Sequence, residues 1–297
     1  MTMRDRMVTV GIIASGEGPV EQFKAGMRTH NFVEGRNIRF ETRLAGGDSG
    51  KLVGFARQLV DHPVDLIAVV GAVGARAARS VTSLIPIVYA VVVDPVGDGL
   101  ATSSGSPLPN MTGVTTFDAG QAPAQLALLQ SIKPDLITVA YLADAAVSDC
   151  LANANLRAAQ GAGLRATALR IIGPDPDLDG VFASLRQDRV QAIVALEQPA
   201  IGANARKIAE RARALNIPTI FARDQALCGG LLGYGTSLAE AAHVMARPVS
   251  RVLGGEAPAD IPIESFCCPE LIVDMAAARC LGLTIPQAVL ARAKCVN

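Results

Sequence analysis

Residues 64–99 constrain the fold more than any other part of the chain. Residues 64–70 are a short apolar run rich in Val, bounded by a proline and a glycine, which is typical of a strand buried on both faces. Residues 71–74 predict a tight turn, 75–83 a helix with small side chains, and 85–93 a second strand. Parallel strands joined by a helix end at one edge of their sheet, and ligands bind at that edge in open α/β sheets.

The same alternation of strands and helices runs through most of the chain. The first part reads β-α-β-α-β-α-β, with further strands at 7–14 and 38–44 and helices at 20–29 and 49–61. A second α/β series begins near residue 122. Its predicted strands are 136–142, 166–172, 192–196 and 218–222, and its predicted helices are 122–131, 149–161, 177–188 and 203–215.

Three extended pieces separate these series, at residues 111–117, 229–235 and 261–266. We therefore predict an α/β protein with two Rossmann-like lobes, each with a parallel sheet, joined by three crossing strands around one cleft. A helix over 238–253 completes the first lobe, and a helix over 286–294 ends the chain. The predicted N-terminal lobe is 1–114 plus 236–264, and the C-terminal lobe is 115–235 plus 265–297.

Composition excludes several classes of protein. The 297 residues carry 27 basic and 27 acidic side chains, so the clustered basic excess that nucleic acid binding needs is absent. No apolar run approaches the roughly 20 residues of a membrane span. No G-x-G-x-x-G opens the first helix, and no cysteine spacing fits zinc, so we expect neither a cofactor nor a metal.

The six cysteines and the start of the chain carry two further expectations. We expect the cysteines to be small buried hydrophobes rather than redox or metal groups. The start, MTMRDRMVTVGII, has no hydrophobic signal segment, which fits a mature chain without its leader or a cytoplasmic protein.

Five motifs in order resemble a known family. They are NFVEGRNIRFETRLAGGD, LIPIVYAVVVDPVGDGL, NMTGVT, CGGLLGYGTS and LGLTIPQAVLARA. Together they are similar to ABC-transporter substrate-binding proteins of the tryptophan/tyrosine-binding type, with the type I periplasmic-binding fold. The resemblance implies a periplasmic monomer that captures a small solute, an amino acid or an aromatic or carboxylate compound, by hinge closure and delivers it to a membrane permease.

The chain departs from this family at several ligand positions. Where the family has Asn-Pro and Asn-Ser in the second lobe, this chain has Asp144-Ala145 and Asp149-Cys150. Where an Asp is usual after the third strand of that lobe, the chain has Glu197-Gln198. The first loop reads Ser15-Gly16-Glu17 and lacks the usual Gln and His.

Candidate ligand-binding residues follow the predicted strand ends of the first lobe. The N–H groups of Gly71, Ala72 and Val73 open a helix and favour an anion such as a carboxylate, the alternative being an ordinary turn with water on those donors. Asp94 accepts from a ligand donor or caps its own turn. Ser15 and Glu17 end the first strand and reach the same space.

The second lobe adds a matching set of candidates. Asp144, Glu197 and Gln198 follow strand ends, and Pro199 is expected to direct the chain outward. Tyr234 lies in a predicted hinge strand, where it stacks on a ligand or packs within the hinge.

Two other functions stay open from the sequence. One is a cofactor-free racemase or isomerase using Cys150 and Cys228, although no His or basic residue lies beside either in a motif. The other is the ligand-sensing part of a regulator, for which the N-terminus leaves no room for a helix-turn-helix.

Overall fold

The computed structural model describes residues 7–62 and 64–296. Residues 1–6 of the start MTMRDRMVTVGII lie outside this range. Residue 63, the proline that precedes residues 64–70, also lies outside it. The chain divides into two compact units. Unit 1 contains the described residues up to Phe117 together with Leu238–Cys267, and unit 2 contains Asp118–Ser237 and the described residues from Cys268 onward.

Unit 1 is built on a parallel sheet with strand order β11-β5-β4-β3-β1-β2 in the described part of the chain. Its strands are β1 (Val8–Ala14), β2 (Ile38–Leu44), β3 (Leu66–Val70), β4 (Ile87–Val92), β5 (Met111–Thr115) and β11 (Glu264–Ser265). Its helices are α1 (Glu17–Thr29), α2 (Leu52–Asp61), α3 (Ala72–Val81), α9 (Leu238–Val244) and α10 (Ala246–Leu253), with short 3₁₀ turns at Ser49–Lys51 and Pro258–Asp260.

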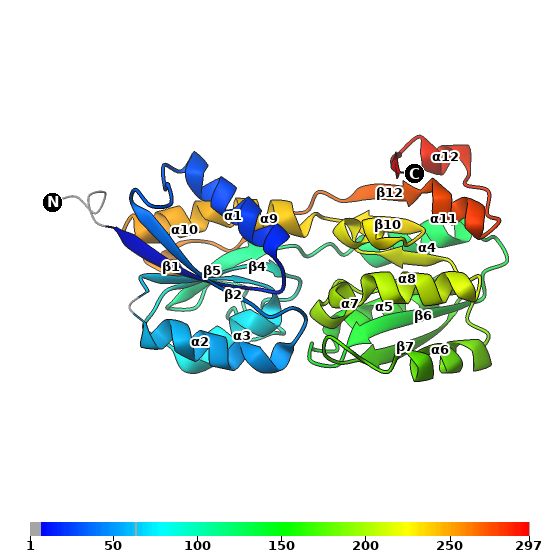
Figure 1. Cartoon of the computed structure of the whole chain (residues 1–297), viewed down its shortest axis with the longest axis horizontal. Coiled ribbons are helices and arrows are strands. Elements are labelled where there is room, and N and C mark those ends of the chain that lie inside the picture. The colour runs from blue at the N-terminus through cyan, green and yellow to red at the C-terminus, as the bar shows by residue number, and fades with distance from the viewer. Residues whose placement is uncertain (1–6, 63, 297) are drawn as a thin grey trace. The chain divides into compact units, whose positions relative to one another are not determined.

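Helices cover both faces of the unit 1 sheet (Figure 1). One core layer joins the sheet to α1, α9 and α10 through buried residues such as Phe23 and Met245. The other joins it to α2 and α3, with Leu59 and Ala78 buried. Strands buried on both faces explain the continuous Val and Ile runs in the sequence.

Unit 2 is built on a mixed sheet with order β13-β12-β10-β9-β8-β6-β7 in the described residues. Its strands are β6 (Thr138–Asp144), β7 (Arg165–Ile171), β8 (Ala192–Ala195), β9 (Thr219–Phe221), β10 (Leu232–Gly235), β12 (Glu270–Asp274) and β13 (Ala293–Val296). Its helices are α4 (Gln121–Ile132), α5 (Cys150–Gly161), α6 (Leu178–Gln187), α7 (Pro199–Ala203), α8 (Ala205–Ala214), the 3₁₀ helix η3 (Arg223–Cys228), α11 (Met275–Cys280) and α12 (Gln287–Leu290).

The helices of unit 2 likewise form two layers (Figure 1). One core layer holds α4, α5, α11 and α12, and the other holds α6, α7 and α8. β12 runs antiparallel to β10, whereas the other described pairings of this sheet are parallel. The α/β class with parallel-dominated sheets is confirmed, and β12 is the departure from a purely parallel sheet.

Several predicted elements are wrong in extent. The terminal helix over 286–294 stops at Leu290, because the following residues pair as β13 with the open edge of β12. The helix over 238–253 is broken at Met245, since Pro248 has no N–H for the carbonyl of Val244. Pro199 does not turn the chain outward. It begins α7, where a missing N–H is tolerated.

The extended pieces predicted to cross between lobes belong largely to the sheets. β5 and β11 lie in unit 1, and β10 lies in unit 2. The chain passes from one unit to the other after Phe117, Ser237 and Cys267.

The cysteines also differ from expectation. Cys150, Cys267, Cys268, Cys280 and Cys295 are exposed, and Cys228 is half-buried. The prediction that they are buried hydrophobes is wrong, because they lie at helix ends, on the edge strand β13 and in the segment between β11 and β12, where little of the chain covers them.

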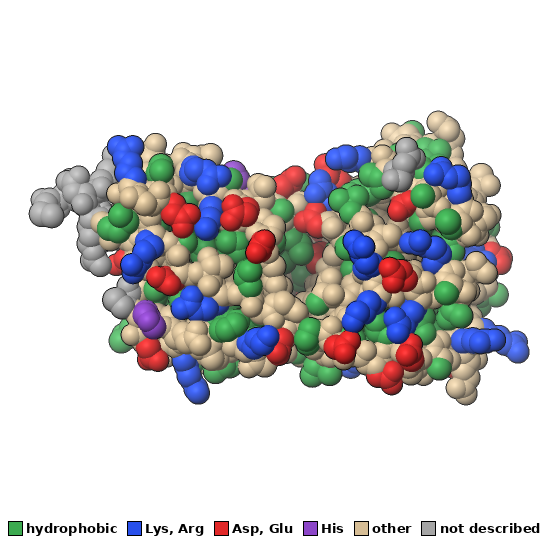
Figure 2. Space-filling model, in the orientation of Figure 1, with side chains coloured by type: hydrophobic (Ala, Val, Ile, Leu, Met, Phe, Trp, Pro, Cys, Tyr) green, Lys and Arg blue, Asp and Glu red, His purple; other side chains and the backbone are tan. Residues whose placement is uncertain are grey.

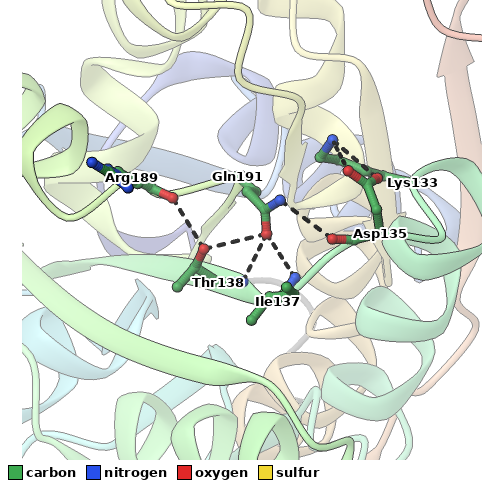
Figure 3. Close-up of polar contacts among 6 residues, drawn as sticks. All are labelled: Lys133, Asp135, Ile137, Thr138, Arg189 and Gln191. Atoms are coloured by element: carbon green, nitrogen blue, oxygen red, sulfur yellow. Dashed lines mark hydrogen bonds and ion pairs between the residues drawn. The ribbon is translucent and has the colours of Figure 1, made fainter.

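Gln191 ties together the amino-terminal ends of β6 and β8 in unit 2 (Figure 3). Its Oε1 accepts hydrogen bonds from the backbone N–H of Ile137 at 2.7 Å and of Thr138 at 3.1 Å, and its Nε2 donates to the carbonyl of Asp135 at 3.3 Å. Thr138 Oγ1 donates in turn to the carbonyl of Arg189 at 3.0 Å. One side chain therefore satisfies the backbone donors where β6 enters the sheet.

Replacing Gln191 by alanine is expected to destabilise the protein by about 1–2 kcal/mol, because two backbone donors lose their shared acceptor. Urea unfolding followed by circular dichroism measures the change. The exposed Gln187, at the end of α6, is the matched control, and its alanine variant should stay within about 0.5 kcal/mol of wild type. Equal stability of the two variants would contradict the role of Gln191.

The visible surface carries both signs of charge. Figure 2 shows Lys and Arg side chains interspersed with Asp and Glu on the visible face of each unit. Several are paired, as in Arg247–Glu264 and Arg251–Glu256. Among the described residues, no helix combines the length and the apolar character needed to cross a membrane.

Candidate functional site

Helix α3 begins at the carboxyl edge of the unit 1 sheet, directly after β3. Gly71 follows β3 with φ of 105° and donates its N–H to the carbonyl of Ala90 at 2.9 Å, joining the ends of β3 and β4. α3 begins at Ala72, three residues earlier than predicted, so Ala72 and Val73 form its first turn rather than a loop. Among the residues that the structure describes, no side chain caps this helix, and its first turn holds no acid. Its free N–H groups and dipole therefore favour an anion.

The end of β4 is strained beside this helix. Val91 has φ of 60°, in the left-handed region that a β-branched side chain rarely adopts, and the pairing of β4 with β5 shifts register between Tyr89 and Val92. Such strain clusters at functional sites. Asp94 follows, and its Oδ1 accepts the N–H of Gly97 at 2.8 Å. The turn-capping alternative for Asp94 is thus formed in the structure, and a ligand contact by its other oxygen stays a prediction.

Three further residues complete this edge. Ser15 and Glu17 are exposed, on either side of the start of α1. Thr116, directly after β5, is buried, and its Oγ1 has no hydrogen-bond partner among the described residues. The sequence analysis missed Thr116 because it treated residues 111–117 as a linker. Its signal was a hydroxyl residue at the end of a short apolar strand.

The carboxyl edge of the unit 2 sheet is acidic. Asp144 ends β6 and is buried, with Oδ1 accepting the N–H of Ala146 at 2.9 Å and Oδ2 the N–H of Ala200 at 2.8 Å. Gln198 Oε1 accepts the N–H of Asp144. These hydrogen bonds of Asp144 and Gln198 tie together the loops that follow β6 and β8. Direct ligand contact by Asp144 and Gln198 stays a prediction.

Glu197 follows β8 in an environment that disfavours its charge. The residue is half-buried, and its Oε1 is enclosed with no hydrogen-bond partner in the described part of the chain. Burial, and then the charge of Asp224, raise the pKa of Glu197 to about 8. A carboxyl group with a strongly raised pKa at a sheet edge is a candidate functional group.

Asp224 and Arg223 were missed by the sequence analysis. They lie on η3, after β9, which pairs with β8. Arg223 Nη1 donates to Asp224 Oδ1 at 2.7 Å and its Nε to Glu270 Oε2 at 2.9 Å. The signal for them was the same as for Glu197, namely charged residues just after a short apolar strand.

Tyr234 lies in β10 and is half-buried. Its side chain packs against the core layer of unit 2 that holds α4 and α5, and its carbonyl accepts from Gln125 Nε2 at 3.3 Å. This is the packed alternative of the sequence analysis. Within residues 7–62 and 64–296, no His, Cys, Asp and Glu side chains gather in a group that would hold a metal ion.

Two α/β units that the chain connects three times, each with candidate binding groups at the carboxyl edge of its sheet, have the fold of type I periplasmic binding proteins. The chain belongs to the ABC transporter substrate binding protein family, whose model matches residues 10–297.

Comparisons with individual proteins agree with this assignment. Over 95 residues, 32% of this chain, it is 30% identical to a tyrosine-binding protein of Clostridioides difficile strain R20291, of which the match spans 28% of the length. It resembles the structure of a conserved domain protein from Vibrio cholerae with a TM-score of 0.92 and 22% identity, covering 98% of this chain and all of that one. An ABC domain in complex with L-Trp from Streptococcus pneumonia matches with a TM-score of 0.87 and 21% identity, covering 98% of this chain and 100% of that one.

Proposed function

We propose that this protein is the solute-binding component of an ABC importer. It captures an amino acid, or another small aromatic or carboxylate compound, by hinge closure and presents it to a permease in the membrane. The supporting observation is the uncapped start of α3 in a chain whose family binds transported solutes. The protein works as a periplasmic monomer without catalysis.

The two sheet edges have complementary roles in this proposal. The N–H groups of Ala72 and Val73 bind the carboxylate of the solute, since α3 supplies the favourable end of its dipole and no protein carboxylate occupies its first turn. Glu197 of unit 2, whose enclosed oxygen has no partner among the described residues, is suited to accept from a donor group such as an ammonium. An amino acid carries both groups.

Isothermal titration with a panel of amino acids and aromatic acids tests the function. We expect at least one solute to bind with a Kd in the micromolar range or tighter, and X-ray scattering to record compaction with it. No heat and no compaction across the panel would contradict the proposal. Fast alkylation of Cys150 together with Cys228 at neutral pH would instead favour the racemase or isomerase alternative.

Replacing Ala72 by aspartate tests the anion site. The new carboxylate lies in the first turn of α3, where it repels a solute carboxylate but suits the helix dipole. We expect affinity for carboxylate solutes to fall by at least about tenfold. Because Ala72 packs partly against the core, any fall in melting temperature caused by the larger side chain should be shared by the uncharged control.

The matched control is Ala72→Asn, which has nearly the same shape without the charge. It should retain most of the affinity. Equal losses in the two variants would show that side-chain size, not charge, disturbs binding and would contradict an anion site at α3.

A further inference from the structure

Three carboxyl groups and one guanidinium group lie at the carboxyl edge of the unit 2 sheet. Glu197 follows β8, Asp224 lies on η3 after β9, and Glu270 begins β12. Arg223 is shared between Asp224 and Glu270, and Ser237 Oγ donates to Asp224 Oδ2 at 3.1 Å. These three carboxyl groups with Arg223 are named the acidic cluster. If every member were ionised, its net charge would be negative.

Glu197 is the member of the acidic cluster that forms no hydrogen bond or ion pair within the described residues. Its Oε1 is enclosed and unpartnered, and Gln225 Oε1, on the same 3₁₀ helix as Asp224, is also enclosed without a donor. An enclosed carboxylate oxygen without a donor disfavours the charged form of Glu197, so the group is expected to take up a proton or bind a cation. The two acceptors follow the neighbouring strands β8 and β9, where a proton on Glu197 or a cationic donor would reduce the cost of enclosing an oxygen.

We propose that Glu197 holds a proton while no solute is bound and exchanges it for the cationic group of the solute, so that solute capture releases a proton. This inference deepens the proposed function and rests on it. In the exchange, the O–H bond of the Glu197 carboxyl group breaks, the proton passes to water, and the carboxylate pairs with the ammonium or guanidinium group that arrives.

The charged groups around Glu197 support this exchange. Asp144 ends β6, the strand that pairs with β8, and has both oxygens bonded to backbone N–H groups; Asp224 on η3 acts on Glu197 and accepts a hydrogen bond from Arg223. Glu270 on β12 takes part of the charge of Arg223. Burial and the charge of Asp224 raise the pKa of Glu197 to about 8, so at pH 7 its neutral form predominates.

A carboxyl titration of the protein without solute is the first test. Carbon-13 NMR of glutamate-labelled protein follows the side-chain carboxyl signals with pH, and Glu197→Gln identifies the signal of interest by its loss. We expect a midpoint near pH 8 for Glu197. A midpoint below pH 6 would overturn the proposal. Glu210→Gln, which removes an exposed carboxyl group on α8, should leave the Glu197 signal unchanged.

The second arm uses ethylammonium chloride as the probe of a cationic group, against sodium chloride at the same concentration. Ethylammonium should lower the Glu197 midpoint by at least half a pH unit relative to sodium, because the organic cation competes with the proton. Equal midpoints in the two salts would show that the site does not exchange a proton for such a cation and would overturn the proposal.

These two arms need no identified solute, so their failure is distinct from that of the proposed function. If Glu197 titrates with a midpoint below pH 6 and a solute of the panel binds, the solute-binding function stands and the proton exchange is contradicted. A raised midpoint that responds to ethylammonium, with no solute bound in the panel, would contradict the solute-binding role instead. For a cationic solute that binds, affinity should fall about tenfold for each pH unit below 8.

Discussion

The Gly26→Ala variant is expected to be less stable than wild type by about 2 kcal/mol or more. Gly26 lies in α1 where that helix packs on α9 and α10, and a Cβ there would stand 2.5 Å from the carbonyl oxygen of His243 and 2.8 Å from Cβ of Ala246. The backbone of α9 would have to move, which places the cost at the upper end of overpacking, about 3 kcal/mol or more. This cost exceeds the roughly 1 kcal/mol that alanine gains over glycine in a helix.

The matched control is Gly54→Ala in α2. Gly54 is also helical, but it is exposed and a Cβ there meets nothing within 4 Å. This variant should therefore be stabilised by about 0.5–1 kcal/mol. Urea unfolding of both variants measures the difference, expected to be about 3 kcal/mol. Similar stability of the two would show that α1 does not approach α9 as closely as the structure describes.

The Glu197→Gln variant is expected to be more stable than wild type at alkaline pH, by an amount that depends on pH. The pKa of Glu197 is raised from 4.5 to about 8 by folding, so between these values the folded state binds the extra proton. The stability of wild type consequently falls as pH rises through this window. Glutamine does not titrate, so its variant lacks this loss.

The stability gap between the two proteins should be small at pH 4.5, grow by at most about 1.4 kcal/mol per pH unit, and level off above pH 8. Its full value is on the order of 4 kcal/mol. Urea unfolding at pH 5, 7 and 9 measures it, with Glu210→Gln as the control that should show no such trend. A gap that is the same at pH 5 and pH 9 would contradict a buried, charge-poor environment for Glu197.

Local sequence patterns predicted the architecture well. The apolar run before Gly71 could only be buried on both faces, and it forms β3 inside a parallel sheet. The terminal segment was beyond such reasoning. Residues 293–296 pair with β12 because that strand has an open edge, which no property of the segment itself reveals.

The candidate site was likewise predictable in part from the sequence. Position alone placed Gly71 and Glu197 at strand ends, because a strand must stop where its apolar run stops. The charge that acts on Glu197 could not be found in this manner, since Asp224 comes from a segment 27 residues further along the chain.

By itself, the sequence determined most of the strands and helices, and that strand ends with polar residues face a common edge, because burial periodicity and turn residues act over short distances. Only the tertiary structure decided that Glu197 carries an enclosed oxygen beside Asp224, that Asp94 caps its own turn and that the cysteines are exposed. Burial and electrostatic environment depend on groups distant in the chain, and these groups come together only when both layers of helices have packed on the sheet.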